Sequence, residues 1–305
     1  MIMDFWKEHP RRNLWQHSLW GDFQISVGRK TRLLEVDGAT ALVVQHSLPF
    51  ALNWLEVPRG PLFTNEKSLS KILEKIKGVG KKEQSVFVRL SPYQSLKIKN
   101  LELKITNYDH HPQTSLVLDL TLSDEELLAQ MKPKGRYNIK VGERHGIQVR
   151  PSEDVSEFHR LLLITGGRDG FGAHPKSYYE KMLSALGDHA QLLLAEYEGR
   201  VIAGGIFVYI DEWGIYYYGA SDHHYRNLMA PYLVQWAAVK EAQKRGCKHY
   251  DFLGISPERS KNHAWAGVTE FKKKFGGQVV EYPQACELVL RPSWYWLYRF
   301  YKKLR

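Results

Sequence analysis

In some stretches of the chain apolar residues alternate with polar ones, and in others they recur every three or four positions. Because alternation is typical of strands and the longer period of helices, the chain is predicted to alternate strands and helices. Short apolar runs at Ala41–Val44, Phe50–Trp54 and Phe87–Leu90 predict strands in the first third. Apolar residues three or four apart in a lysine-rich stretch predict a helix over Ser68–Lys77 that ends at Gly78. This mixture is typical of an α+β fold.

The clearest helix signals surround residue 130. Apolar alternation at Leu116–Leu120 predicts a strand, and a capping box that begins at Ser123 predicts the start of a helix. Pro133 interrupts that helix because proline removes a backbone donor, and a second helix is predicted over Gly135–His145. A strand and another helix start follow, which indicates a domain boundary near residue 150.

The second half of the chain predicts a regular antiparallel layer. It contains three strands separated by short turns, then a long helix and a further strand: Leu192–Tyr197, Val201–Ile210, Trp213–Ala220, Asn227–Arg245 and His249–Leu253. Antiparallel strands followed by a helix and another strand are what an acetyltransferase-like α+β layer presents.

Composition narrows the class of protein. The 305 residues suffice for about two domains, and 43 Lys and Arg against 33 Asp and Glu leave a net charge of +10. This charge favours a polyanionic partner such as nucleic acid, a phosphorylated substrate or an anionic membrane. No apolar run reaches the roughly 18 residues of a membrane-spanning helix, and the first residues lack the apolar stretch of a signal peptide, which predicts a cytoplasmic protein. The two cysteines and the adjacent histidine pairs match no disulfide framework or metal set, so we expect no metal.

Basic residues are concentrated between Lys132 and Arg144, where five lie within thirteen positions. On a helix Arg136, Lys140 and Arg144 are four residues apart and share one face. This row either binds phosphates or is a solvated cationic face.

The segment Phe271–Gly277 places three consecutive lysines between two aromatic residues. Buried rings on both sides would hold the segment and aim one ammonium group. An ammonium aimed into a cleft stabilises an oxyanion or a phosphate, whereas the alternative is a surface loop with all three lysines in water.

Two turn regions are weaker candidates for binding an anionic group. The pattern predicts a loop between two helices over Gly166–Gly172, in which Arg168 either binds an anion or has no ligand. Arg226 follows the strand end at which acetyl-CoA-dependent transferases hold a pyrophosphate. Met229 and Pro231 stand where such a site has glycines, which disfavours coenzyme A.

The last residues, Ser293–Arg305, combine aromatic and basic side chains. Such a tail either lies on an anionic membrane surface or forms a helix that docks on the first domain.

Four motifs in the same order resemble the FemABX family of aminoacyl-tRNA-dependent peptidoglycan bridge transferases. The resemblance runs from about residue 120 to the C-terminus, and no coiled-coil arm is visible, as in the compact type of the family. The motifs are Met131–Ile147, Thr165–Phe171, Tyr217–Ser221 and Glu270–Tyr282.

The resemblance implies two tandem acetyltransferase-like (GNAT-like) domains with a substrate channel between them, one of residues 1–150 completed by 284–305 and one of residues 151–283. It implies transfer of an amino acid from aminoacyl-tRNA to the stem-peptide amino group of a peptidoglycan precursor, either UDP-MurNAc-peptide or lipid II. The amine attacks the ester directly, without a cofactor. Both substrates are polyanions, which suits a basic protein, and we also expect peripheral contact with the inner face of the membrane.

By the same resemblance, Lys272 is the candidate catalytic residue that stabilises the oxyanion, and Phe271 shapes the channel. Arg168 and one of Tyr217 or Tyr218 are candidates for binding the precursor, with the choice of tyrosine open. The residues implied to contact tRNA or phosphate are Arg136, Lys140, Arg144 and Lys273.

Three alternatives stay open. The same layers suit an acyl-CoA-dependent N-acyltransferase, a non-catalytic protein that binds RNA or a membrane surface, or a family member with another acceptor. The sequence also leaves open the transferred amino acid, the accepting stem-peptide residue and the oligomeric state.

Overall fold

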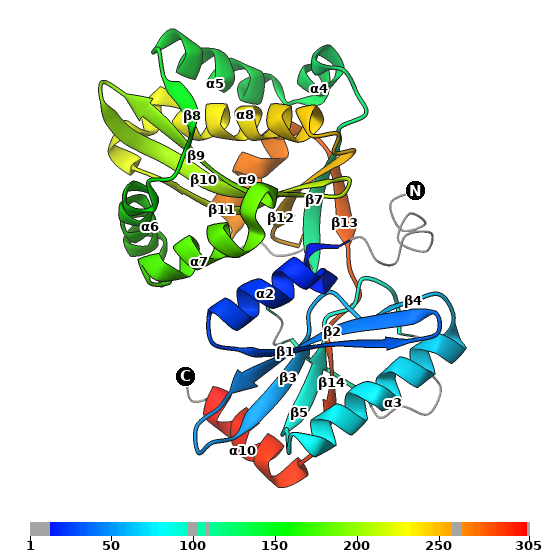
Figure 1. The fold of residues 1–305 in the computed structure, drawn as a ribbon. Coiled ribbons are helices and arrows are strands. Elements are labelled where there is room, and N and C mark those ends of the chain that lie inside the picture. The colour runs from blue at the N-terminus through cyan, green and yellow to red at the C-terminus, as the bar shows by residue number, and fades with distance from the viewer. Residues whose placement is uncertain (1–12, 97–102, 108–109, 258–263, 304–305) are drawn as a thin grey trace. The chain divides into compact units, whose positions relative to one another are not determined.

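The computed structural model describes residues 13–96, 103–107, 110–257 and 264–303. By its contacts the chain divides into two units, one formed by Met1–Gln113 with Glu281–Arg305 and the other by Thr114–Val280. Within the described residues each unit holds a sheet of seven strands flanked by helices (Figure 1). The predicted α+β class is confirmed.

The first unit contains a sheet in the order β1-β2-β3-β5-β14-β6, with β4 paired to β2. Helix α3 (Glu66–Lys82) packs on this sheet because Leu69, Ile72 and Ile76 recur on one of its faces. Helix α2 (Ser18–Ser26) precedes the first strand in the chain. The strands are β1 (Lys30–Val36), β2 (Ala39–Ser47), β3 (Asn53–Val57), β4 (Leu62–Phe63), β5 (Phe87–Leu90), β6 (Leu103–Ile105) and β14 (Cys286–Val289).

The C-terminal segment enters the first unit as a strand and a helix. Strand β14 lies between β5 and β6 and is antiparallel to both. Helix α10 (Pro292–Lys303) then packs Tyr295 and Tyr298 against Phe87 of β5. The C-terminal residues therefore share the core of the first unit.

The boundary between the units lies at residues 113 and 114, whereas the sequence pattern indicated residue 150. Residues 114–150 join the second unit because β7 (Thr114–Asp119) pairs with β12 (His249–Gly254) and Ile139 lies in the same core as Leu233. Helix starts and proline breaks are local signals, so they do not reveal which core a segment joins.

The second unit contains a sheet in the order β13-β7-β12-β11-β10-β9-β8. Helices α5 and α8 cover one face of this sheet, and α6 and α7 cover the other (Figure 1). The predicted three-stranded meander is confirmed as β9, β10 and β11. The remaining elements are α4 (Asp124–Gln130), α5 (Pro133–Arg144), β8 (Gln148–Ser152), α6 (Val155–Asp169), α7 (Lys176–Leu186), β9 (Ala190–Tyr197), β10 (Arg200–Ile210), β11 (Trp213–Ser221), α8 (Ala230–Lys244) and β13 (Gln278–Glu281).

Several local signals act as predicted. The Ser123 hydroxyl accepts a hydrogen bond from the Glu126 amide at 3.3 Å, and the Glu126 carboxylate accepts one from the Ser123 amide at 2.8 Å. Pro133 occupies the first turn of α5, where proline is tolerated, so that helix begins two residues earlier than predicted. The second predicted strand begins only at Asn53, because Phe50 lies in a turn with φ of 61°.

Three predicted helix ends differ from the structure. Helix α3 continues through Gly78 to Lys82, because its buried row extends beyond that glycine. Helix α6 continues into the predicted glycine-rich loop as far as Asp169 and is capped by Gly170, which has φ of 75°. The predicted long helix divides at Met229, where φ of 58° separates a 3-10 helix, η3 (His223–Leu228), from α8.

Among the described residues, the longest helix is α3 with 17 residues, and no helix there combines the length and apolar character needed to cross a bilayer.

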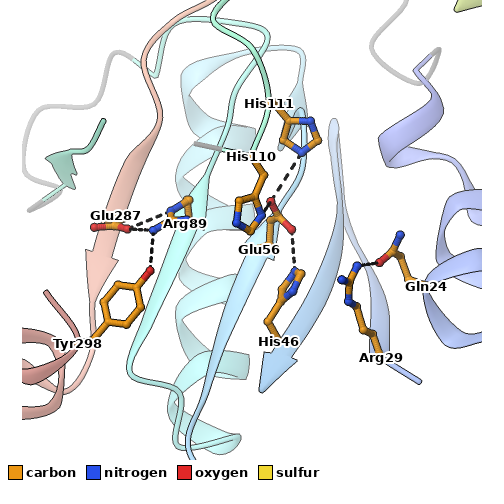
Figure 2. Close-up of polar contacts among 9 residues, drawn as sticks. All are labelled: Gln24, Arg29, His46, Glu56, Arg89, His110, His111, Glu287 and Tyr298. Atoms are coloured by element: carbon orange, nitrogen blue, oxygen red, sulfur yellow. Dashed lines mark hydrogen bonds and ion pairs between the residues drawn. The ribbon is translucent and has the colours of Figure 1, made fainter. Parts of the chain in front are cut away.

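An ion pair is buried where the C-terminal strand joins the first sheet (Figure 2). Arg89 on β5 places Nη2 2.6 Å from Oε1 of Glu287 on β14, and neither residue is more than 1 % exposed. The Tyr295 hydroxyl donates to the other carboxylate oxygen at 2.6 Å. Burial opposes the charge of Arg89, but Glu287 outweighs it and raises the pKa of the guanidinium.

A second buried carboxylate, Glu56 on β3, is surrounded by three imidazoles (Figure 2). His46 Nε2 lies 2.7 Å from Oε2, while His110 Nδ1 and His111 Nε2 lie 3.1 Å and 3.7 Å from Oε1. Burial raises the pKa of Glu56, but the hydrogen bonds with His110 and His46 outweigh burial and hold that pKa well below its usual value. The group is therefore charged at neutral pH.

This carboxylate should make the protein acid-sensitive. The pKa of Glu56 is lower in the folded than in the unfolded chain. Its stabilising contribution is therefore complete above the unfolded pKa of about 4.3 and is lost as the pH falls through the lower folded value. Urea titrations should therefore show a smaller loss of unfolding free energy between pH 5 and pH 3 in Glu56→Gln than in the wild type. Equal losses in the two proteins would contradict this prediction.

Candidate active site

Lys272 is the buried member of the lysine run. It ends helix α9 (Ala266–Lys272), is 7 % exposed, and donates from Nζ to the Gly254 carbonyl at 2.7 Å. Nζ also lies 5.6 Å from the centre of the Tyr216 ring, within the range of a cation–π contact. Burial lowers the pKa of Lys272 to about 8, partly opposed by Asp251, so the ammonium form predominates at pH 7. The surface-loop alternative is thus wrong for this lysine.

The carbonyl that Lys272 contacts lies at a distorted strand end. The β12 register shifts between Asp251 and Gly254, and Leu253 between them has φ of 56°. The Asp251 carboxylate, 4 % exposed, accepts hydrogen bonds from the Leu253 amide at 2.7 Å and from the Ser115 hydroxyl. These bonds hold a backbone conformation that is unfavourable for leucine.

The helix that carries Lys272 is tied to the segment after β12. The Thr269 hydroxyl accepts a hydrogen bond from the Ser256 amide at 2.8 Å, and both residues are buried. On the other side, η4 (Lys273–Phe275) buries Phe275 against Tyr232 and Phe252. The predicted anchoring by a buried ring is confirmed for Phe275. Phe271, on the other side of the run, is only half-buried, with its ring centre 5.0 Å from that of Tyr232.

The other two lysines of the run have different surroundings. Lys274 Nζ donates to the Tyr232 hydroxyl at 3.1 Å, whereas Lys273 is half-buried. The Lys274 carbonyl accepts a hydrogen bond from the Lys132 amide at 3.1 Å. A side chain at Gly135 would approach that carbonyl oxygen to 2.5 Å, so only glycine lets α5 pack this closely against η4.

A pocket with about 90 Å³ of free space opens next to Phe271. This volume is well below the roughly 300–1,000 Å³ of a pocket for a drug-sized ligand, and it suits one small group such as a phosphate or carboxylate. Its charged and imidazole lining residues are Arg168, Asp222, His223 and Arg226. The two guanidinium groups outnumber the single carboxylate of the lining, Asp222, which favours an anionic ligand.

Arg168 and Phe271 are the predicted site residues that line this pocket; Lys272, Tyr217 and Tyr218 are not among its described lining residues. Arg168 already pairs with its neighbour Asp169, with Nε 2.6 Å from Oδ1 and Nη2 2.7 Å from Oδ2. The hydrogen bond from Arg168 lowers the pKa of Asp169. An anion in the pocket must therefore share this guanidinium with Asp169.

Sequence reasoning did not select Asp222 and His223 for the site. Asp222 is 3 % exposed and caps η3, where its Oδ1 accepts a hydrogen bond from the His224 amide at 3.0 Å. An aspartate directly after a strand is a recognisable helix-capping signal. Only the fold, however, brings it beside Arg168, which is 54 positions earlier in the chain.

The two candidate tyrosines lie on β11. Their ring centres are 5.0 Å apart, and Tyr218 meets Tyr179 of α7 edge-on at 5.2 Å. Burial raises the pKa of the Tyr218 hydroxyl far above its usual value, so the hydroxyl keeps its proton. The tyrosine beside Lys272 is instead Tyr216, which sequence reasoning did not select. That one of Tyr217 or Tyr218 binds the substrate stays a prediction.

The basic row on α5 divides into two kinds of residue. Arg136 Nη1 donates a hydrogen bond to the Leu128 carbonyl at 3.2 Å and another to the Met131 carbonyl. These carbonyls lie at the C-terminal end of α4, so Arg136 caps that helix. Lys140 is exposed, and the exposed Arg144 lies with its guanidinium carbon 5.7 Å from the centre of the Tyr137 ring. Lys140 and Arg144 present positive charge to solvent, whereas Arg136 supports the fold.

This division predicts different effects of two substitutions on one helix. Arg136→Met should lower the free energy of unfolding by about 1 kcal/mol, because the carbonyls at the end of α4 lose their donor. Lys140→Met should leave stability within about 0.5 kcal/mol, because that side chain is exposed. Urea titrations of the two variants measure the difference. Loss of stability in Lys140→Met alone would contradict the assignment.

Comparison with known proteins agrees with this architecture. A model described as the FemAB family matches residues 2–114, 100–200 and 196–303. The lipid II:glycine glycyltransferase of Staphylococcus epidermidis is 22 % identical over an alignment that covers 96 % of this chain and 92 % of the relative. The crystal structure of FemX superposes with a TM-score of 0.82 at 20 % identity, covering 97 % of this chain and 96 % of that one.

A tandem GNAT protein from the clavulanic acid biosynthesis pathway superposes with a TM-score of 0.51 at 11 % identity, covering 82 % of this chain and 78 % of that one. These likenesses support the predicted tandem acetyltransferase-like fold. The alignment with the Staphylococcus epidermidis relative runs over 383 positions although this chain has 305 residues, so that relative contains segments that this chain lacks. Because the family model spans nearly the whole chain, this protein belongs to the FemAB family.

Proposed function

We propose that this protein is an aminoacyltransferase that moves an amino acid from aminoacyl-tRNA to the stem-peptide amino group of a peptidoglycan precursor. Family membership and the lipid II:glycine glycyltransferase activity named for its relative support the reaction class. The observation that carries the proposal is the buried ammonium of Lys272, because acyl transfer from an ester develops negative charge on a carbonyl oxygen.

In the proposed reaction the stem-peptide amine attacks the ester carbonyl, and a C–N bond forms as the carbonyl oxygen takes up the electron pair. The tetrahedral intermediate then breaks its C–O bond, the tRNA ribose oxygen leaves, and the amine's proton ends on that oxygen. Lys272 stabilises the oxyanion by turning its ammonium from the Gly254 carbonyl to the developing charge. The low exposure of the site strengthens this interaction.

Because both substrates are negatively charged, we assign binding roles to the basic residues around the site and on α5. The pocket beside Phe271 binds one phosphate or carboxylate group through Arg168 and Arg226. Exposed Lys140 and Arg144, together with half-buried Lys273, contribute charge for tRNA. Lipid II is the acceptor that the relative's name supports. We therefore infer that the reaction takes place in the cytoplasm, at the inner face of the membrane.

The acyl-CoA alternative is disfavoured by the start of α8. A pyrophosphate at a helix N-terminus needs several free backbone N–H groups within close reach. Here Met229 and Pro231 line the pocket, and the proline removes one such donor from the first turn.

The deciding experiment incubates the purified protein with total charged tRNA and either UDP-MurNAc-pentapeptide or lipid II, followed by mass spectrometry of the stem peptide. We expect an added mass of one amino-acid residue, abolished when RNase is added before the reaction starts. The precursor that gains mass is the acceptor. Acetylation of the peptide from acetyl-CoA without tRNA, or no added mass with either precursor, would contradict the proposal.

A further inference from the structure

Helix α10 has an inner face that is firmly attached to the first unit. Tyr295, 6 % exposed, has its ring centre 5.6 Å from that of Phe87, and its hydroxyl donates to the buried Glu287 carboxylate. Tyr298 lies 5.0 Å from the same Phe87 ring. The orientation of the helix on its sheet is therefore determined by packing, and the opposite face must point away from the core.

That opposite face exposes large apolar side chains. Trp296 is 68 % exposed, Phe300 is 62 %, Leu297 is 51 % and Tyr301 is 45 %. These positions are one, four and five residues apart, so they lie on one side of the helix. The other exposed large apolar residues of the described first unit stand singly on four different segments: Ile25 on α2, Leu33 on β1, Phe50 in a turn and Ile105 on β6. A contiguous patch of this kind marks an interaction surface, whereas scattered residues do not.

The segment that carries the patch is basic in composition. Residues 288–305 contain no aspartate or glutamate, and their cations are Arg291, Arg299, Lys302, Lys303 and Arg305. Lys104 on the adjacent strand β6 is exposed and has Nζ 5.8 Å from the centre of the Tyr295 ring. Two copies of this chain docked through the patch would bring two basic helices together, which disfavours self-association.

Exposed tryptophan, phenylalanine and leucine on one side of a basic helix is the composition that lies in the interface of an anionic bilayer. The rings enter the headgroup region, and each nearby Lys or Arg contributes roughly 1 kcal/mol of attraction to anionic lipids. We propose that the outer face of α10, formed by Trp296, Leu297, Phe300 and Tyr301, is a docking surface for an anionic phospholipid membrane. This inference depends on the surface alone and holds whether or not the proposed transfer reaction is correct.

The test is co-sedimentation of the full chain with vesicles of 30 % phosphatidylglycerol in phosphatidylcholine. We expect binding to these vesicles, at least tenfold weaker binding to pure phosphatidylcholine, and weakening by 0.5 M salt. The double variant Trp296→Ser with Phe300→Ser should bind the anionic vesicles at least tenfold more weakly. Its melting temperature should be unchanged, because both side chains are exposed.

A matched control replaces two exposed apolar residues elsewhere in the first unit, Ile25→Ser with Phe50→Ser, which are 56 % and 83 % exposed. This control should bind as the wild type does. Brominated acyl chains should quench wild-type tryptophan fluorescence more than that of Trp296→Phe. Equal vesicle binding by the α10 variant and the wild type would overturn the proposal.

Size-exclusion chromatography with light scattering tests the alternative that a second copy of this chain covers the patch. A wild-type dimer that becomes monomeric in the α10 double variant would assign the patch to a second copy and overturn membrane docking. Vesicle binding requires neither tRNA nor precursor, so its failure is separable from failure of the proposed reaction. With soluble UDP-MurNAc-pentapeptide, the α10 variant should keep wild-type turnover if that precursor is a substrate.

Discussion

Replacing Lys272 with methionine should lower kcat for aminoacyl transfer about 10²–10³-fold, the usual effect of removing one donor that stabilises an oxyanion. The substitution keeps the apolar stem that α9 packs in the core and removes only the ammonium group that contacts Gly254. The melting temperature should not fall. A lysine whose pKa is lowered to about 8 by burial costs the folded state free energy at neutral pH, and methionine relieves that cost.

The pH profile of kcat gives a second, independent readout for Lys272. Because the ammonium form is required, wild-type turnover should fall above pH 8 as that group loses its proton. Lys181→Met, on the exposed side of α7, is the matched control and should keep wild-type turnover. Turnover in Lys272→Met within threefold of the wild type would remove this residue from the chemistry.

Replacing Arg89 with methionine should lower the free energy of unfolding by about 3–5 kcal/mol, which is the cost of leaving a buried charge without its partner. Glu287 is fully buried, and Arg89 contacts it through both Nε at 3.0 Å and Nη2 at 2.6 Å (Figure 2). Urea titration at pH 7 measures the change. Loss of β14 pairing should also speed backbone hydrogen exchange in β5, its neighbour.

An exposed ion pair provides the control for Arg89. Arg150→Met breaks the pair with Glu196, whose atoms are 3.0 Å apart with side chains 56 % and 31 % exposed, and should cost less than about 1 kcal/mol. Adding Glu287→Leu to Arg89→Met should recover more than half of the lost stability, because it removes the buried carboxylate that has lost its nearest cation. A double variant as unstable as Arg89→Met alone would contradict this account.

Much of the local structure could be predicted from the sequence. The capping box at Ser123, the break at Pro133 and the three strands of the second half depend on residues close together in the chain, so their signals survive without tertiary context. The family resemblance likewise depended on local motifs between residue 120 and the C-terminus. Helix ends at glycines such as Gly78 were misplaced, because a buried apolar row continues a helix past a residue of weak propensity.

The sequence by itself determined the α+β class, most secondary-structure elements and the lysine run between two aromatic residues. Only the tertiary structure decided which lysine is buried, because burying an ammonium is unfavourable until partners such as the Gly254 carbonyl and the Tyr216 ring are brought to it. It likewise decided where the first unit ends and that Asp222 lies in the pocket with Arg168. These outcomes depend on contacts between residues far apart in the chain, which periodicity and spacing do not encode.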